Sequence, residues 1–221
     1  MSKSDARQIV DRIRAELGAL DAKIRRHPYV AAVETGKVSR DSLKGFAGHQ
    51  YYIIGSDLAS VAQLISRHGA LPGRQYLLGI LQGESAAYDA CLKFAEALGM
   101  DQAELAAWEP LPAGAAYAHF MAWLGSHGSA CEFAAAILVN FAAWGSNCGR
   151  LGRALRTKYG FKDQDLTFFD LFAGTPPSFE QDSLDVIDYG LARGVEPSLV
   201  VRAARLLQGY ELMYWDAMAE L

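Results

Sequence analysis

Histidine is scarce in this sequence, and none follows residue 127. The 221 residues include only five histidines. A centre that holds two irons needs several His, Asp and Glu ligands converging from facing helices. The histidine content speaks against such a centre, so we predict no bound metal and no cofactor. His27 precedes Pro28 where a helix should break, which is typical of a structural joint, and a heme ligand is the alternative for this residue.

Cysteine is also rare, and its pattern argues against disulfides. Cys91, Cys131 and Cys148 form an odd set without paired spacing. The sequence shows no basic segment followed by an apolar run that would act as a signal peptide. We therefore expect a cytoplasmic protein in a reducing compartment, with three buried and unreactive thiols.

Charge is nearly absent from the middle of the chain. Between Pro110 and Gly149, the only formally charged residue is Glu132. A membrane span needs about 20 apolar residues, and the uninterrupted part at 133–149 is too short and ends in polar residues. We expect a helix buried on all sides of a bundle and no membrane association. The formal net charge of −4 gives no reason to expect nucleic-acid binding.

Apolar residues recur every three or four positions along the chain, and no segment alternates with a period of two for long enough to form a strand. Helix starts are marked by Pro28, by Ser39 as an N-cap, by a capping box at 129–132 and by Pro197. No linker or repeat divides the sequence. We predict one all-α domain over residues 1–221, opened by a long helix whose apolar face contains Ile9, Ile13, Leu17, Leu20 and Ile24.

Five segments resemble, in order and spacing, motifs of the TenA family, which includes thiaminase II. They are the residues from His27 to Val30, Leu43 to Tyr52, Tyr117 to Met121, Glu132 to Trp144, and Tyr210 to Met218. The resemblance covers nearly the whole chain. It implies a bundle of the heme-oxygenase-like fold with a central pocket for a small-molecule ligand, assembled into homodimers or homotetramers.

The sequence departs from the family pattern at two positions that matter for chemistry. The catalytic cysteine of the family falls at Asn140, whose amide cannot attack carbon as a thiolate does. The family carboxylate that holds an aminopyrimidine falls at Tyr51. Glu211 matches the late acid/base glutamate of the family, and Tyr117 matches a pocket tyrosine. The resemblance therefore implies a divergent member in which Glu211 is the catalytic candidate.

The candidate ligand-binding residues are polar or aromatic side chains within apolar helix faces. A carboxylate such as Glu211, in a pocket lined by apolar and aromatic residues, would have a raised pKa, which suits proton transfer near neutral pH. Asn140 either contacts the ligand or is satisfied by neighbours in the core. Tyr51 and Tyr52 point in different directions on a helix, and one of them should enter the pocket. The predicted ligand-binding residues are Tyr51, Tyr52, Tyr117, Asn140, Trp144 and Tyr214.

Three functions are open from the sequence. The first is a TenA-like protein that binds a small heteroaromatic molecule and hydrolyses a C–N bond of an aminopyrimidine, of the thiamin-salvage type, with Glu211 as acid/base. The second is a non-catalytic ligand-binding or regulatory protein built on the same pocket. The third is a cofactor-free oxidase resembling the enzyme of pyrroloquinoline-quinone synthesis, which shares the tyrosine pair at 51–52. All three need Glu211 and Asn140 to project from separate helices into one chamber.

Overall fold

The computed structural model describes residues 5–70 and 72–221, and the other positions of the predicted domain 1–221 lie outside the described residues. In the described part the chain forms α-helices and one short 3-10 helix but no strand, which confirms the all-α class. The elements are α1 (Asp5–Glu16), α2 (Gly18–Arg25), α3 (Pro28–Glu34), α4 (Arg40–His68), α5 (Gly73–Ala97), α6 (Gln102–Ala106), α7 (Pro112–His127), α8 (Ala130–Tyr159), η1 (Asp163–Asp165), α9 (Thr167–Ala173), α10 (Phe179–Leu191) and α11 (Pro197–Ala219).

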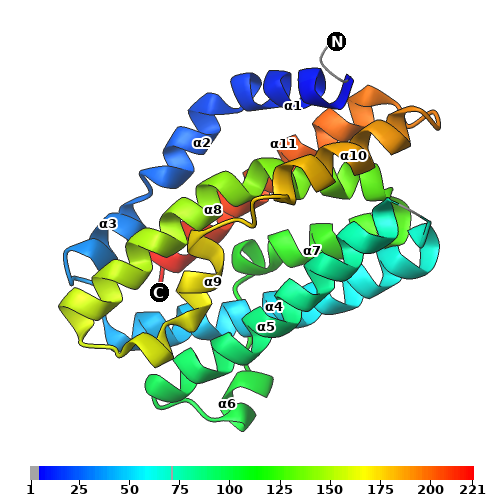
Figure 1. Cartoon of the computed structure of the whole chain (residues 1–221). Coiled ribbons are helices and arrows are strands. Elements are labelled where there is room, and N and C mark those ends of the chain that lie inside the picture. The colour runs from blue at the N-terminus through cyan, green and yellow to red at the C-terminus, as the bar shows by residue number, and fades with distance from the viewer. Residues whose placement is uncertain (1–4, 71) are drawn as a thin grey trace.

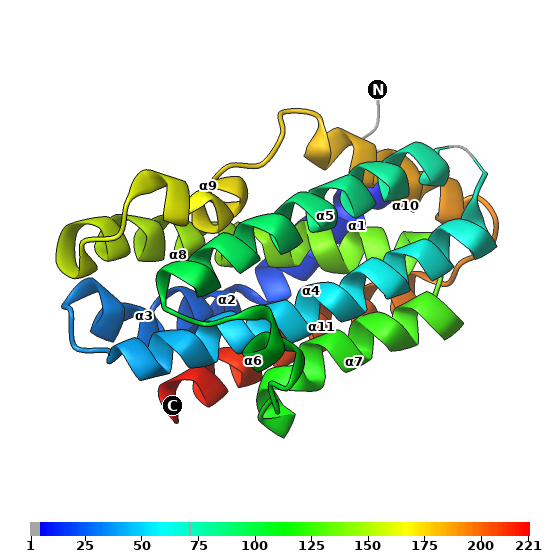
Figure 2. The same ribbon diagram turned by 90° about the horizontal axis from the view of Figure 1, so that it is seen from below.

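The long helices form two facing layers. In one layer α4 packs against α5 and α7, and in the other α8 packs against α10 and α11 (Figure 1). The layers meet where α7 packs on α11 and where α9 contacts both α8 and α5. The view from below shows α6 lying outside the layer of α4, α5 and α7 (Figure 2). The candidate site lies between the two layers.

Helix boundaries follow the capping signals of the sequence. The Ser39 hydroxyl accepts a hydrogen bond from the backbone N–H of Ser42 at 3.0 Å, where α4 begins. Ser129 and Glu132 form a complete capping box at the start of α8, and Pro197 occupies the first turn of α11. The Ser39 and Ser129 side chains accept hydrogen bonds from backbone N–H groups that have no partner within the helix, whereas Pro197 has no backbone N–H group to satisfy.

The first helix differs from the prediction, because it divides at Leu17 into α1 and α2. Leu17 has a ψ of 2°, which is outside the helical region, and Gly18 after it has the low helix propensity that favours a break. The two halves differ in their main partner, since α1 packs mainly on α10 and α2 mainly on α11. The predicted apolar face is thus shared between two shorter helices that point in different directions.

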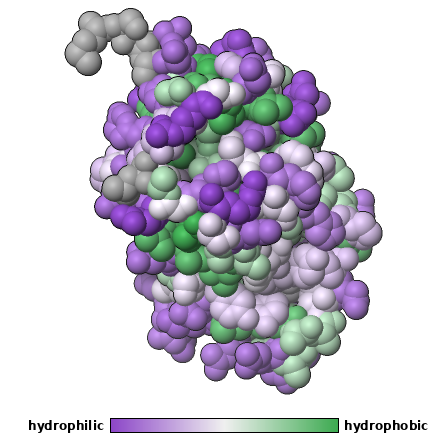
Figure 3. All heavy atoms as spheres, turned by 90° about the vertical axis from the view of Figure 1, so that its right-hand side faces the viewer, coloured by the Kyte–Doolittle hydropathy of each residue, from purple (hydrophilic) through white to green (hydrophobic). Residues whose placement is uncertain are grey.

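The helix α8 is enclosed at its N-terminal end, where Glu132 is the only charged residue. Every residue from Ala130 to Asn140 is buried. Among residues 5–70 and 72–221, no helix is both long and apolar enough to cross a lipid bilayer. Figure 3 views the bundle from the right-hand side of Figure 1 and shows hydrophilic and hydrophobic side chains interspersed over that face.

The three thiols are buried and free, as expected from their scattered positions. Burial raises the pKa of Cys91 and of Cys131 to about 12, and the pKa of Cys148 well above its usual value. The thiols therefore stay protonated near neutral pH, and none of the three has the thiolate character of a nucleophile.

An aromatic cluster around Phe46 of α4 connects the two layers. The Phe46 ring is 2% exposed, and its centroid lies 5.6 Å from that of Phe169, 6.2 Å from Tyr214 and 6.4 Å from Trp215. Stacked, tilted and edge-on contacts of this kind stabilise beyond the burial of apolar area. The cluster fixes Tyr214 and Trp215 on α11, three and four residues after Glu211.

Candidate active site

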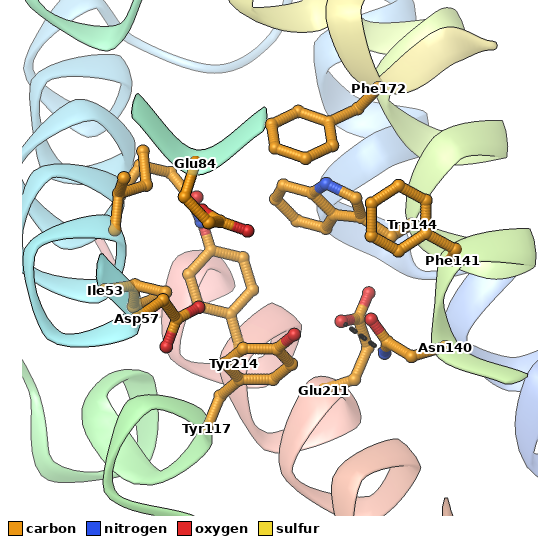
Figure 4. A pocket seen from close by; sticks show the side chains of 12 residues that line it. Ile53, Asp57, Glu84, Tyr117, Asn140, Phe141, Trp144, Phe172, Glu211 and Tyr214 are labelled. Atoms are coloured by element: carbon orange, nitrogen blue, oxygen red, sulfur yellow. Dashed lines mark hydrogen bonds between the residues drawn. The ribbon is translucent and has the colours of Figure 1, made fainter. Parts of the chain in front are cut away.

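A small cavity, which we call the inner cavity, lies between the two layers and has a volume of about 40 Å³. Figure 4 shows Asp57 and Glu84 on the side formed by α4 and α5, and Asn140 and Glu211 on the opposite side. A cavity of this size holds one or a few water molecules or a small polar group. It is lined by Gln50, Ile53, Ile54, Asp57, Glu84, Tyr117, Asn140, Phe141, Trp144, Phe172, Glu211 and Tyr214.

Glu211 of α11 and Asn140 of α8 meet at the wall of the inner cavity. The Asn140 Nδ2 donates to Glu211 Oε2 at 3.0 Å and to Gln208 Oε1 at 2.9 Å. The Trp215 indole Nε1 donates to Glu211 Oε1 at 2.8 Å. Each carboxylate oxygen therefore accepts one hydrogen bond and keeps a second lone pair. Glu211 and Asn140 thus project from separate helices into one cavity, which is the arrangement that all three functions require.

Burial dominates the protonation of Glu211. Its side chain is 2% exposed, and the loss of hydration raises its pKa from 4.5 to about 7, although the hydrogen bonds from Asn140 and Trp215 lower the pKa. A carboxyl group with this pKa is partly protonated and partly ionised at neutral pH. It can therefore accept a proton and return it within one reaction cycle.

Two further carboxyl groups line the inner cavity, and neither was predicted from the sequence. Asp57 of α4 is 4% exposed, and Glu84 of α5 is partly exposed. Burial raises the pKa of Glu84 to about 7. Burial and the neighbouring charge of Glu84 raise the pKa of Asp57 well above its usual value. The cavity therefore contains three carboxyl groups from three helices.

A sequence signal for both acids exists, because each occupies a position on the apolar face of its helix. Asp57 follows Ile53 by four residues and Ile54 by three. Glu84 stands four residues after Ile80 and three before Ala87. Residues at these spacings share one helix face, so a carboxyl group among them is a candidate for burial.

Two tyrosines of the predicted set line the inner cavity. Burial and the negative charges of Asp57, Glu211 and Glu84 raise the pKa of Tyr117 well above its usual value. The Tyr117 hydroxyl therefore stays protonated and can donate a hydrogen bond to a ligand. Burial raises the pKa of Tyr214 well above its usual value, and the Gln50 side chain, which also lines the inner cavity, lies beside its hydroxyl.

The structure does not bring Tyr51 and Tyr52 to the inner cavity. The ring of Tyr51 packs against Tyr88 with centroids 5.2 Å apart, and the Tyr52 hydroxyl lies 3.0 Å from His119 Nε2 at an exposed position. The expectation that one of the two enters the pocket is therefore corrected. Neighbouring residues on a helix point about 100° apart, and Gln50, the residue before this pair, is the one that faces the inner cavity.

A larger cavity, which we call the outer cavity, adjoins the inner one and has a volume of about 840 Å³. Glu84, Phe141 and Phe172 line both cavities and so form the wall between them. The rings of Phe141 and Phe172 have centroids 5.8 Å apart, and Trp144, a predicted ligand-binding residue, meets Phe172 edge-on from the inner side.

The donor groups of the site do not fit a metal or a heme. In the described ranges 5–70 and 72–221, no three His, Cys, Asp or Glu side chains are grouped so as to hold a metal ion. His27, the alternative heme ligand, has both ring nitrogens engaged: Nε2 lies 3.0 Å from Asp216 Oδ1, and Nδ1 accepts from the backbone N–H of Tyr29 at 3.3 Å. His27 caps α3 ahead of Pro28, which is the role of a structural joint.

The fold and these motifs have counterparts among known proteins. A model of the TENA/THI-4/PQQC family matches residues 14–169. The chain belongs to the TENA/THI-4/PQQC family. No curated protein matches the sequence. The fold of this TENA/THI-4/PQQC protein is shared with solved structures of low sequence identity, so those structures support the fold alone.

Two of these structures are TenA homologues. The one from P. horikoshii has 18% identity and a TM-score of 0.75, over 96% of this chain and 98% of that one. The one from Pseudomonas syringae pv. tomato has 14% identity and a TM-score of 0.82, over 100% of this chain and 95% of that one. A heme oxygenase-1 from the cyanobacterium Synechocystis, in complex with heme, has 13% identity and a TM-score of 0.61, over 96% of this chain and 91% of that one. The heme-oxygenase-like fold is therefore common to all of them.

The raised carboxyl pKa values predict that this TENA/THI-4/PQQC protein becomes more stable as the pH falls from 8 to 5. An acid whose pKa is higher in the folded than in the unfolded state binds protons preferentially when folded. The stabilisation from protonated Glu84 and Glu211 is complete below about pH 4.5 and is lost as the pH rises through about 7. We expect the melting temperature to increase by several degrees between about pH 8 and about pH 5.

Thermal melts across this range check the prediction, and Glu84→Gln should flatten the dependence because glutamine does not titrate. Glu34 and Glu180 have lowered pKa values beside arginines, so their contributions are lost only below about pH 4.5, outside the window. Burial lowers the pKa of His49, which opposes the trend below about pH 6.5, but this is one group against the carboxyl groups with raised pKa values. A melting temperature that is constant or falls on acidification from pH 8 to pH 5 would contradict the assignment.

Proposed function

We propose that the protein hydrolyses a C–N bond of a small nitrogen heterocycle, with thiamin-derived aminopyrimidines as the first substrate class to examine. The observation that carries the proposal is Glu211: a buried carboxyl group with a pKa of about 7 that is held at a cavity wall by Asn140 and Trp215. Membership of the TENA/THI-4/PQQC family supports the same class of ligand.

The reaction needs a water molecule, because Asn140 cannot act as a nucleophile and the thiols are buried and protonated. Glu211 in its ionised form accepts a proton from water as the water oxygen bonds to the carbon. The C–N bond then breaks, and Glu211 returns the proton to the departing nitrogen. Tyr117 remains protonated and donates a hydrogen bond to the substrate, while the Asn140 Oδ1 is left as an acceptor, since Nδ2 is already engaged.

The size of the inner cavity supports one position for the substrate in this proposal. About 40 Å³ has room for an amino or formylamino group with its water, but not for the ring that carries it. The ring would lie where Phe141 and Phe172 separate the two cavities. Aromatic side chains at this position suit a flat heterocycle.

Turnover assays with purified protein test the proposal. Release of ammonia from aminopyrimidines, or of formate from formylaminopyrimidines, is the expected result, and it should persist after treatment with a chelator. Absence of turnover, together with identical behaviour of the Glu211→Gln variant, would reject the hydrolase.

A non-catalytic binder is the second candidate. Both oxygens of Glu211 already accept hydrogen bonds from the protein, and this arrangement serves recognition as well as proton transfer. An increase of the melting temperature with an aminopyrimidine, without product in the same sample, would support this function instead.

A further inference from the structure

Five carboxyl groups line the two cavities, and within the part of the chain that the structure describes no Lys, Arg or His lines either of them. Burial penalises an ionised carboxylate unless a positive charge or hydrogen-bond donors compensate it. When these groups ionise, the walls repel anions and attract a cation, and a bound cation in turn favours their ionised form. The five are Asp57, Glu84 and Glu211 at the inner cavity and, at the outer cavity, Glu84 again with Asp182 and Asp185.

Asp57 gives the most specific sign of a missing partner. Its side chain is 4% exposed, and its Oδ1 accepts no hydrogen bond from the described residues. Leaving a buried acceptor unsatisfied costs about 1–3 kcal/mol, and more for a charged group. Figure 4 shows Asp57 and Glu84 projecting from α4 and α5 toward the same part of the inner cavity. A group with several N–H donors and a positive charge would satisfy both acids.

The volumes of the two cavities set the shape of the ligand. The inner cavity of about 40 Å³ admits a head group of a few atoms, whereas the outer cavity of about 840 Å³ is in the range of pockets for much larger molecules. The outer walls are largely apolar, with Ile80, Leu171 and a stacked pair of rings from Tyr76 and Phe179. Glu84 lies on the boundary, so a ligand that spans the two cavities passes it.

We infer that the site binds an amphiphilic organic cation, with a primary ammonium or amidinium head between Asp57 and Glu84 and an aromatic or apolar body in the outer cavity. The inference rests on the site of the proposed function and deepens it, since it gives the ligand a charge and a second, apolar part. Glu211 lies across the inner cavity from this head group and remains available for proton transfer.

Isothermal titration calorimetry near pH 8 with phenylbutylamine and phenylbutanol tests the charge. The two probes share their apolar body, and only the amine is a cation. We expect the amine to bind at least about tenfold more tightly, which corresponds to one charge-assisted hydrogen bond. Asp57→Asn and Glu84→Gln should each reduce this preference to about threefold or less. Glu96→Gln, at an exposed position of α5 outside both cavities, removes the same charge and should leave the preference unchanged.

A second pair of variants tests the outer cavity. Gly79 of α5 lines it, and a Cβ at Gly79 would meet no atom within 4 Å, so Gly79→Trp should fold and fill the space. Gly55→Trp is the matched control, because Gly55 on α4 is equally open and lines neither cavity. We expect Gly79→Trp to weaken phenylbutylamine about tenfold or more while butylamine, which lacks the ring, is affected less.

The inference is overturned if the amine and the alcohol bind alike, if neither binds, or if the preference survives in both Asp57→Asn and Glu84→Gln. These outcomes are independent of catalysis, because the readout is binding. Charge-selective binding without turnover of aminopyrimidines would leave this inference standing and reject the hydrolase. Turnover without charge-selective binding would reject this inference and leave the hydrolase standing.

Discussion

The Glu211→Gln variant is expected to lose turnover by a factor of about 10²–10⁴, which is the usual contribution of a positioned acid/base. Glutamine has the same shape but neither accepts nor returns a proton. One of its two polar atoms, the amide NH₂, must also face a donor, either the Asn140 amide or the Trp215 indole. The loss of one of these hydrogen bonds is offset by removal of a buried carboxyl group, so we expect the variant to fold.

The kinetic measurement should separate kcat from KM. A role for Glu211 in the chemical step lowers kcat, whereas a role in holding the ligand alone would raise KM and leave kcat unchanged. Glu220→Gln makes the same change near the end of α11 at an exposed position and should have wild-type kinetics. If Glu211→Gln retains the wild-type kcat and is folded by circular dichroism, Glu211 is not the acid/base.

The Phe46→Ala variant is expected to lose about 3–5 kcal/mol of unfolding free energy, as is usual for truncating a fully buried phenylalanine. Phe46 is 2% exposed and contacts rings from α5, α9 and α11, including Phe94, Phe169 and Trp215. Its removal would leave a cavity in the cluster that holds Trp215, the donor to Glu211. Effects on both stability and activity are therefore expected.

Urea unfolding, followed by circular dichroism, measures this loss. Leu78→Ala on α5 is the matched control: Leu78 is 41% exposed, so its truncation should change the unfolding free energy by no more than about 0.5 kcal/mol. A loss below about 1 kcal/mol in Phe46→Ala would mean that the cluster is not part of the core that determines stability.

The helical class and most helix starts could be predicted from the sequence, because local rules determine them. Ser39, the Ser129–Glu132 box and Pro197 act through backbone groups within one turn, and the structure has them as expected. The break at Leu17 was missed because both halves keep the same apolar spacing, and a single glycine at position 18 is tolerated in many helices.

The candidate site was predictable only in part. Glu211, Asn140 and Tyr117 were found through their motifs, but motif matching fixes a position along the chain and not a direction around the helix. An error of one residue on α4 selected Tyr51 where Gln50 faces the cavity. Asp57 lies outside the motifs, and its convergence with acids from other helices depends on tertiary packing, which apolar spacing does not encode.

Asp57, Glu84 and Glu211 come from α4, α5 and α11, and the packing of these helices brings three carboxyl groups to one cavity at the cost of their hydration. The groups that would recognise a cationic ligand therefore lower the free energy of unfolding. Replacing the three acids by neutral residues of the same shape would give a more stable helical bundle that no longer attracts a positively charged ligand. Attempts to engineer heat resistance into this protein should leave these three positions untouched and work on the rest of the bundle.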